Sequence, residues 1–578
     1  MSVAGVLLTW LNIKNASCGN DTDKPLGIDE ACFSVVNTND HAVELYSIVS
    51  ECYVCNGIPQ ANLSANSNTS LIIPTRYPMH VYYVDKTEYC HTTFSFVQYG
   101  HYGWNITDRS CSSIYTLAEP VNPYLPILMT LIVLATCAIL GTLARVLTVK
   151  CRALLQRKFL RETENSQNDR EWLQPANLAE PLVMVSKTKN RMHVIDAFRG
   201  ITILLMVFVN NGGGSYRIFQ HSPWNGLTIA DLVLPWFAWI MGLTLSMSLH
   251  TQFRVTVPRT KIILKTVRRM MILILLGLVI NSIKTPPIKH LRFPGILQLL
   301  AISYCICVIL EVLFAQTQRN YHFGRLMFLQ DILNNWIQWL IILTIVAIHT
   351  LITFLLPVPN CPTGYLGPGG YHLYGKYANC TGGAAGYIDR FIFGNHIYNN
   401  THNPVYGPVL PHDPEGMMNT MSAILFVYFG VQAYKIVISH PQNKAMLFRW
   451  LLWSFTLGII AGILSNFSKE EGVIPVNKNM MSLSFVLATS SLAFFIYAIL
   501  WFVIMHRQFW TGAPFIYAGA NSIFIYVGHY LTMDLFPWYW EVNSVPTHSS
   551  VLAMNLWSTT LWGIIAYGLY KKNIIITV

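Results

Sequence analysis

Long apolar stretches alternate with short polar or turn-rich segments along most of this 578-residue chain. A helix needs about 20 apolar residues to cross roughly 30 Å of hydrocarbon. Stretches of this kind cover about residues 124–147, 194–211, 226–248, 262–283, 294–316, 334–356, 414–437, 447–465, 480–505, 513–534 and 550–570. Because backbone groups cannot stay unpaired in lipid, the pattern predicts an α-helical polytopic membrane protein with about 11 transmembrane helices.

Residues 1–120 follow a different pattern. Apolar and polar residues alternate in "HVYYVDKTEYCHTTFSFVQYG", which is typical of strands. The segment "CYVC" is compatible with a redox pair or half of a zinc site, but no second metal pair accompanies it, and disulfides are favoured. We therefore expect a small disulfide-bonded β-rich domain. Its cysteines are Cys18, Cys32, Cys52, Cys55, Cys90 and Cys111.

Two independent signals give the orientation. Lysine and arginine are concentrated in the loop 148–193 and again between Arg254 and Arg269, which the positive-inside bias assigns to the cytosol. Counting crossings from these loops places every Asn-X-Ser/Thr glycosylation acceptor on the opposite side, where such acceptors are used. The acceptors are Asn15, Asn20, Asn62, Asn68, Asn105, Asn379, Asn399 and Asn466. The N-terminus is thus predicted to be lumenal and the C-terminus cytosolic.

This topology divides the chain into four parts. They are a lumenal β domain (1–120), a first transmembrane helix (121–147), a cytosolic basic loop (148–193) and a ten-helix transmembrane domain (194–578). The last part contains a long lumenal loop, 357–413, in which we expect Cys361 and Cys380 to pair. Its many glycines suggest a folded loop that can line a site.

Composition narrows the possible chemistry. Hydrophobic residues make up 53% of the chain and charged residues 11%, against about 25% charged in soluble domains. The chain has no P-loop, dinucleotide-binding glycine motif, HExxH or GxSxG. We expect the lipid bilayer around it, and neither a metal nor nucleic acid as a partner. An ionisable group within a bilayer costs about 2.5 kcal/mol or more, so those present are paired or functional.

The densest group of polar residues lies between the second and third apolar stretches. Asn210 and Asn211 precede three glycines, which allow a tight turn, and His221, Asn225 and Asp231 follow. A histidine in this setting is more readily functional than one on an open surface. Asp231 starts an apolar helix and needs a partner: it either orients His221 or a backbone donor, or bonds to a neighbouring helix.

Other polar groups lie in the second and tenth stretches. Asp196 and Arg199 share one helix face, either as a structural ion pair or with Arg199 binding an anionic ligand from the cytosol. Asn521 and His529 are eight residues apart and return to nearly the same face. His529 is either a second site histidine or an interhelical hydrogen-bonding residue.

From about residue 190 to the C-terminus, the chain resembles a known enzyme family. The resemblance rests on six segments: "VIDAFRGITILLMVFVNNGGG", "HSPWNGLTIADLVLPWFAWIMG", "CPTGYLGPGG", "NCTGGAAGYIDR", "DPEG" and "GVIPVNKN". Together they resemble the heparan-α-glucosaminide N-acetyltransferase family of lysosomal transmembrane enzymes. The β domain matches mainly through "SECYVC". The resemblance implies transfer of an acetyl group from cytosolic acetyl-CoA to the terminal glucosamine amine of heparan sulfate in the lysosome.

The resemblance also implies roles for particular residues. The family's active histidine falls on His221, its neighbouring site asparagine on Asn210, and the glutamate of "DPEG" on Glu415. His221 is expected to act as a base or as an acetyl-accepting nucleophile, and Asn210 to donate to the oxyanion. The cytosolic cations available for the coenzyme phosphates are Arg199, Lys265, Arg268 and Arg269. The lumenal cations available for a sulfated sugar are Arg217, Lys284, Lys289 and Arg292.

Two departures from the family are Met480-Met481, where relatives have Leu-Trp after "VNKN", and a tail without a basic residue near its end. The main rival from the residues alone is a secondary transporter, since glycine-interrupted helices with polar groups at depth also mark transport sites. Two features count against a transporter: no internal repeat is visible between the two halves of the chain, and eleven helices do not divide into two equal repeats. A receptor with a passive anchor would need only one helix. We expect the protein to be a homodimer.

Overall fold

The computed structural model describes residue 18 and residues 25–84, 90–107, 110–167, 193–284, 288–314, 329–541 and 545–576. The chain forms two compact units. One unit contains Met1–Val121 together with His193–Val578, and the other is Asn122–Met192. The predicted acceptors Asn15 and Asn20 lie outside the described residues.

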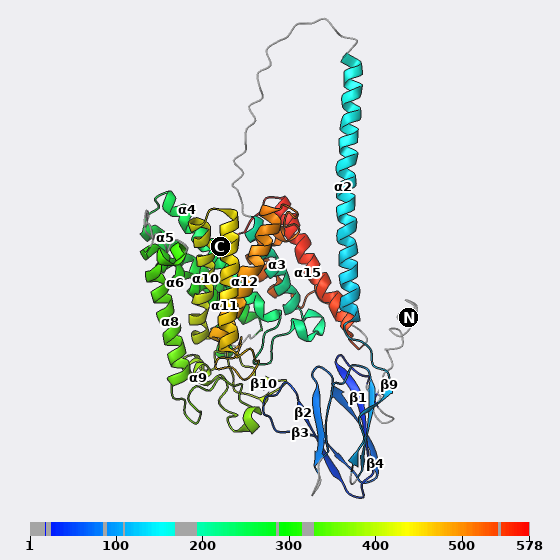
Figure 1. The fold of residues 1–578 in the computed structure, drawn as a ribbon. Coiled ribbons are helices and arrows are strands. Elements are labelled where there is room, and N and C mark those ends of the chain that lie inside the picture. The colour runs from blue at the N-terminus through cyan, green and yellow to red at the C-terminus, as the bar shows by residue number, and fades with distance from the viewer. Residues whose placement is uncertain are drawn as a thin grey trace. The chain divides into compact units, whose positions relative to one another are not determined.

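The N-terminal region is a pair of packed β-sheets (Figure 1). One sheet has the order β4-β1-β7-β8, with β9 also paired to β7, and the other has the order β3-β2-β5-β6. β1 and β7 run parallel. Buried side chains from both sheets, including Phe33, Leu45 and Trp104, form a common core. The strands are β1 (Glu30–Asn37), β2 (Val43–Val49), β3 (Ile58–Leu63), β4 (Ser67–Pro74), β5 (Met79–Val84), β6 (His91–Phe94), β7 (His101–Thr107), β8 (Ser110–Cys111) and β9 (Tyr115–Ala118).

Disulfides pin this region as predicted. The structure pairs Cys18 with Cys32, Cys52 with Cys55, and Cys90 with Cys111. A fourth bond joins Cys361 and Cys380 in the long loop, which confirms the expected pair. "CYVC" therefore forms a disulfide within a tight loop.

A single helix, α2 (Leu125–Gln167), makes up the described part of the second unit. Its 43 residues correspond to about 65 Å of helix, and only Leu125–Leu155 is apolar enough to span a membrane. The prediction ended this helix at residue 147. It continues because the next twenty residues contain no proline or glycine and many good helix formers.

The rest of the first unit is a helical bundle joined by structured loops (Figure 1). Two short helices, α7 (Gln330–Leu333) and α9 (Gly383–Phe393), lie in its loops, and β10 (His402–Asn403) pairs with β11 (Gly407–Pro408). The longer helices are α3 (His193–Asn210), α4 (Val233–Arg254), α5 (Arg259–Lys284), α6 (Ile296–Phe314), α8 (Trp336–Leu355), α10 (Met417–Ser439), α11 (Asn443–Leu464), α12 (Leu483–Trp501), α13 (Phe515–Ala520), α14 (Ser522–Thr532) and α15 (His548–Lys571).

Eight helices among the described residues are long and apolar enough to cross a membrane. They correspond to eight of the predicted stretches and confirm a multi-pass membrane protein. The other three stretches are also helical, as α5, α13 with α14, and α15. The stretch 513–534 is not one continuous helix, because the backbone leaves the helical conformation at Asn521. The count of eleven spans stays a prediction.

Glycines bring two helix pairs into backbone contact. On α4 and α10, a Cβ at Gly242 would collide with the carbonyl of Val427, and one at Gly430 with the carbonyl of Trp239. On α3 and α13, Gly200 faces the Phe515 carbonyl and Gly519 faces that of Asp196 in the same reciprocal way. Small residues allow this close approach, which stabilises helix association in membranes.

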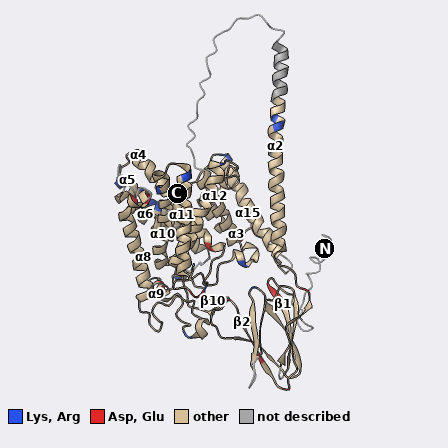
Figure 2. Cartoon of the chain, viewed as in Figure 1, with Lys and Arg blue, Asp and Glu red and all other residues tan. Residues whose placement is uncertain are grey.

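Charged groups inside the bundle are sparse and paired. Most of the helical ribbon carries neither colour in the charge view (Figure 2). Lys435 lies 2.6 Å from Glu311, and Arg449 lies 2.8 Å from the fully buried Asp331. Gln432 also donates to Asp331. Removing one partner of such a pair would leave an uncompensated buried charge, so these residues stabilise the bundle.

We predict that Gly242→Ala lowers the apparent melting temperature of the purified protein in detergent by several degrees. The added methyl group overlaps the Val427 carbonyl, and overpacking of this kind costs about 1–3 kcal/mol. Gly563→Ala on α15 is the matched control, because a Cβ there meets nothing within 4 Å. Unfolding is monitored by tryptophan fluorescence. Equal melting temperatures for the two variants would contradict the packing argument.

Candidate functional site

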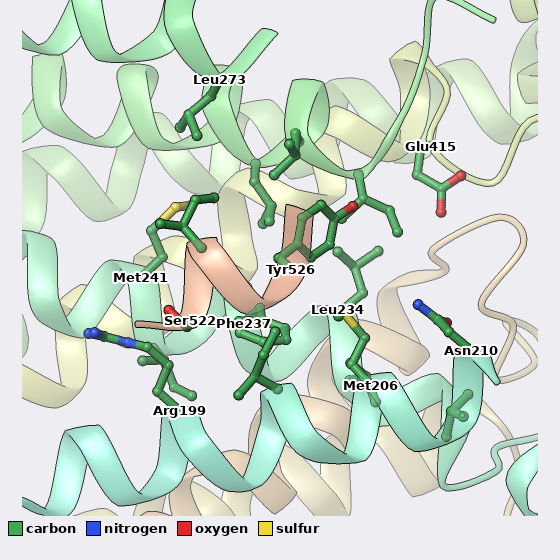
Figure 3. A pocket seen from close by; sticks show the side chains of 18 of the residues that line it. Arg199, Met206, Asn210, Leu234, Phe237, Met241, Leu273, Glu415, Ser522 and Tyr526 are labelled. Carbon is green, nitrogen blue, oxygen red and sulfur yellow. The ribbon is translucent and has the colours of Figure 1, made fainter. Parts of the chain in front are cut away.

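A cavity of about 250 Å³ lies inside the bundle, between α3, α4, α5, α6 and α14. Figure 3 shows Arg199 and Asn210 at opposite ends of the stretch of α3 that lines it, with Glu415 near Asn210. On α5, Asn281 bonds to the Arg292 carbonyl near Glu415, so Arg269, twelve residues earlier on that helix, belongs to the end with Arg199. His221 and Lys478 lie near Glu415 and belong to the end with Asn210. We call these the arginine end and the histidine end.

The wall between the two ends is apolar apart from a few hydroxyl groups. Tyr526 of α14 and Phe237 of α4 line the middle of the cavity, between Arg199 and Asn210 (Figure 3). The apolar lining residues include Ile203, Met206, Val233, Leu234, Met241, Leu273, Ile296, Leu297 and Leu300. A flexible, mostly apolar chain fits this space, whereas a phosphate would lose its hydration there without compensation.

His221 and Asp231 form the central contact of the histidine end. His221 Nδ1 lies 2.7 Å from Asp231 Oδ1. The second oxygen of Asp231 accepts from the Ser222 amide and from the amide and hydroxyl of Thr228. Because Asp231 is buried and ionised, it fixes the Nδ1–H tautomer of His221. The Nε2 lone pair is then the basic position of the ring, and half of the side chain remains accessible.

Lys478 completes this cluster. Its ammonium nitrogen lies 3.1 Å from His221 Nε2, 3.0 Å from Nδ1 and 3.8 Å from Asp231 Oδ1. Only 14% of its side chain is exposed. Burial, and then the positive charge of Lys478, lower the pKa of His221 below its ordinary value, against the opposing effect of Asp231.

Asn210, the last residue of α3, makes two contacts with α14. Its amide nitrogen lies 3.0 Å from His529 Nε2 and 3.3 Å from the Tyr530 hydroxyl. His529 Nδ1 is directed at the Ile525 carbonyl, so Nε2 accepts from Asn210. The buried His529 therefore acts as an interhelical hydrogen-bonding residue that orients Asn210 at the cavity wall.

The glycine turn after α3 is anchored to α15. Gly212, Gly213 and Gly214 all have positive φ angles, which explains the need for glycine here. Asn555 accepts from the Gly214 amide at 2.7 Å and donates to the Asn211 carbonyl at 2.6 Å. The Asn211 side chain in turn donates to Ser558. Asn211 thus supports the turn that sets the path toward His221.

Asn225 joins the two loops that carry His221 and Lys478. Its amide nitrogen donates to Glu470 at 2.6 Å, and its oxygen accepts from Asn477 at 2.8 Å. Asn225 and Asn477 also form an isolated antiparallel bridge. The adjacent Gly226 amide donates to Val476 at 2.8 Å. These bonds fix the loop that carries Lys478 against the loop that carries His221.

Glu415 lines the histidine end and belongs to a second charged cluster. Arg292 pairs with both Glu415 and Asp413, and its Nε lies 2.8 Å from Asp413. The two carboxylates raise the pKa of Arg292, although burial alone would lower it. Arg292 was a predicted cation for the sugar, but here it is engaged by Asp413 and Glu415.

Two of the predicted coenzyme cations line the arginine end. Arg199 donates to the Gly519 carbonyl at 3.2 Å and lies 3.7 Å from Asp196, which matches the expected pair on one helix face. Arg269 stacks on the Tyr304 ring, and its buried Nε has no hydrogen-bond partner. Lys265 and Arg268 are exposed on α5 and do not line the cavity.

Asn521 lies at this same end, where α13 and α14 meet. Its side chain donates to the Ile574 carbonyl and accepts from the Ile576 amide. Asn521 thereby holds the C-terminal segment against the cavity, which Ile576 helps to line. Asn521 and His529 therefore belong to opposite ends of the site, because Asn521 bonds to the C-terminal segment and His529 bonds to Asn210.

The β domain contacts the loops at the histidine end. Glu51, directly before the Cys52–Cys55 disulfide, binds both Arg217 and Lys469. Arg217 was also a predicted sugar cation, and it is already paired with this carboxylate. Trp224, three residues after His221, packs in one apolar cluster with Cys52 and Cys55.

Sequence reasoning identified His221, Asn210 and Asp231 but missed Lys478, Asn477 and Tyr530. Lys478 lies within "GVIPVNKN", where a lysine among asparagines directly precedes an apolar helix, and that was its only signal. Asn477 and Tyr530 become recognisable only through contacts with residues about 250 and 320 positions away. Among the described residues, no three histidine, cysteine, aspartate or glutamate side chains gather as metal ligands do.

Membrane-length helices around a cavity with different chemistry at its two ends define a polytopic membrane protein with an internal site. No protein-family model matches the chain. It is 37% identical over 559 residues to heparan-alpha-glucosaminide N-acetyltransferase of Mus musculus, covering 91% of this chain and 85% of that protein. It is also 37% identical over 516 residues to the Homo sapiens protein of that name, covering 85% and 78%. The chain belongs to the heparan-alpha-glucosaminide N-acetyltransferase family and is an acyltransferase.

We predict that Asp231→Asn lowers acetyltransferase turnover by about a thousandfold or more, because the amide no longer fixes the Nδ1–H tautomer of His221. The measurement is kcat with saturating donor. Asp534→Asn, a change at an exposed aspartate, is the control and should keep full turnover. A near-normal kcat in Asp231→Asn would show that this carboxylate does not contribute to the reaction.

Proposed function

We propose that this enzyme transfers the acetyl group of cytosolic acetyl-CoA to the amine of terminal non-reducing α-glucosamine in heparan sulfate, within the lysosomal lumen. The observation that carries the proposal is the cavity, whose apolar middle separates a guanidinium end from an imidazole end. A charged donor can be held at the first end while its reactive group reaches the second. The names of the relatives support the choice of donor class and sugar.

The length of the cavity supports this arrangement. Arg199 and Asn210 are eleven residues apart on one helix, which corresponds to about 16 Å along its axis. An extended pantetheine arm is roughly 15–20 Å long, about half the hydrocarbon thickness. With the coenzyme phosphates near Arg199 and Arg269, the thioester would lie beside His221.

The proposed chemistry begins with a proton. An amine with a pKa near 8 is mostly protonated in an acidic lumen and cannot attack a carbonyl. The ammonium form of the sugar first releases one proton to water. His221 Nε2 then accepts a second proton from the amine as the sugar nitrogen bonds to the thioester carbon. The C–S bond breaks, and this second proton passes to the departing sulfur, so the products are the N-acetylated sugar, free CoA and the one proton released to water.

The same geometry permits a two-step route, in which Nε2 first takes the acetyl group and then transfers it to the sugar. Release of one equivalent of free CoA per enzyme from acetyl-CoA, with no sugar present, distinguishes this route from direct transfer. In both routes the thioester oxygen becomes negative and needs a donor. We assign this role to Asn210, because the longer of its two bonds, 3.3 Å to Tyr530, is the easier to exchange for an oxyanion.

The orientation follows from the glycosylation acceptors and the basic loops. Among the six acceptors within the described residues, Asn62, Asn68, Asn379, Asn399 and Asn466 are exposed, and Asn105 is half-buried. This supports a lumenal position for the β domain and the histidine end, with the C-terminus in the cytosol. The homodimer stays a prediction.

The competing function is secondary transport of an anionic or sugar substrate. Purified protein in detergent, supplied with glucosamine and acetyl-CoA labelled in the acetyl group, distinguishes the two. An acetyltransferase forms labelled N-acetylglucosamine without any gradient, and a transporter forms none.

We predict that His221→Ala abolishes turnover while binding of acetyl-CoA, measured by calorimetry, stays close to that of the wild type. The imidazole touches only the reacting end of the donor, so the phosphate contacts persist. His506→Ala, distant in sequence and outside the cavity lining, is the control. Wild-type turnover in His221→Ala would exclude this residue from the mechanism.

We predict that Arg269→Met weakens acetyl-CoA binding by about tenfold, because a charge-assisted hydrogen bond to phosphate contributes about 1.5 kcal/mol or more. Arg268→Met removes the neighbouring exposed cation, which does not line the cavity, and should change affinity much less. The dissociation constants of the two variants are compared at one ionic strength. The reverse order would place the phosphates on the outer face of α5.

A further inference from the structure

The acidic lumen poses a difficulty for the proposed base. An imidazole that donates to a carboxylate is normally easier to protonate, because the negative charge favours the imidazolium. With Asp231 as its only charged partner, His221 would be mostly protonated in acid. A protonated ring has no lone pair with which to accept a proton or an acetyl group.

Lys478 supplies a charge at the required position. Its ammonium group contacts the imidazole at 3.0–3.1 Å and also lies 3.8 Å from Asp231. Because its nitrogen is almost equally far from Nε2 and Nδ1, the ammonium lies against the imidazole ring and not in line with either nitrogen's lone pair, and its charge disfavours a further proton on the ring. The carboxylate of Asp231 is thus balanced by a lysine, and no proton on the imidazole is needed.

The backbone around Lys478 is held firmly. Asn477 accepts the Met480 amide on its side chain, and its own amide donates to Ser482. The Met481 amide bonds to the Lys478 carbonyl. Together with the bonds to Asn225 and Gly226, these contacts fix the lysine relative to His221.

The other charged groups near His221 do not replace this lysine. Glu415 faces the ring from the segment before α10 and, like Asp231, favours protonation. Arg292 approaches from the segment before α6, but it is paired with Glu415 and Asp413. Within the described part of the chain, Lys478 is the cation in direct contact with the imidazole.

We propose that Lys478 is a positioning residue that keeps His221 neutral in the acidic lumen, because its ammonium group contacts the ring and balances the charge of Asp231. The inference rests on the proposed function for its biological meaning. Its physical content is the protonation state of one histidine, which is measurable without turnover. The lone pair of Nε2 then remains available to the arriving amine.

The test measures the reaction of His221 with diethyl pyrocarbonate as a function of pH. Of the two protonation states of imidazole, this reagent modifies only the neutral one. Peptide mass spectrometry reports the modification of His221 separately from that of other residues. The variants are Lys478→Met, Lys478→Gln and Lys478→Arg, with Lys376→Met as the control. Lys376 lies in the loop 357–413, stacked on Tyr377 and outside the cavity.

Lys478→Met and Lys478→Gln are expected to raise the pH of half-maximal modification by about one unit or more, since a nearby like charge is lost. Lys478→Arg and Lys376→Met should keep the wild-type midpoint, because both leave a cation beside His221. The glutamine side chain keeps a hydrogen-bond donor but has no charge. Equal midpoints in Lys478→Gln and Lys478→Met would therefore show that the lost charge, and not the lost hydrogen bond, causes the shift. An unchanged midpoint in either Met or Gln, with the protein eluting normally from size exclusion, would overturn the proposal.

Turnover gives a second, independent readout. In Lys478→Met the acidic limb of kcat/KM should move to higher pH by the same amount, so that activity at pH 5 falls about tenfold relative to activity at pH 7. A uniform loss at every pH would indicate a merely structural lysine and would contradict the inference. If the wild type forms no N-acetylglucosamine, the proposed function fails, while the modification experiment still tests Lys478.

Discussion

The carboxylate of Asp231 accepts four hydrogen bonds at the start of α4, from His221, the Ser222 amide and both donors of Thr228. A buried carboxylate without such partners would destabilise the bundle by several kcal/mol. The segment from His221 to Thr228 therefore has to fold back over the end of the helix. The tautomer of His221, the position of Lys478 and the shape of the cavity mouth all follow from this one requirement.

The bilayer imposes the second requirement. Two buried ion pairs, Lys435–Glu311 and Arg449–Asp331, lie within the bundle, and the charged groups that line the cavity lie at its two ends. Close glycine contacts between α3 and α13, and between α4 and α10, place the cavity walls backbone against backbone. An apolar passage of fixed width favours a slim acyl carrier over its phosphorylated head group.

Much of this arrangement was predictable from sequence, for identifiable reasons. Apolar length predicted the eight helices that can cross a membrane, the presence of two cysteines in one lumenal loop predicted the Cys361–Cys380 bond, and the asparagine and glycine cluster at 210–214 pointed to His221. The sequence-based prediction was wrong or incomplete where local sequence features do not determine the structure. Gly519 and Asn521 are weak helix-end signals, and the apolar length of the stretch outweighed them in the prediction. The extension of α2 to Gln167 lies beyond the apolar stretch on which the prediction depended. The pairing of Arg292 with Asp413 and Glu415 spans more than 120 residues, which periodicity cannot report.

The anchoring of the glycine turn by α15 affects the order in which the chain can mature during synthesis. Asn211 leaves the ribosome more than 340 residues before its partners Asn555 and Ser558. Until the last helix is inserted, the amide and carbonyl groups of this turn have to be satisfied by water or by a chaperone. Nascent chains that stall or are truncated before α15 would hold most of the helices and the whole β domain, yet would lack the contacts that order the glycine turn before His221.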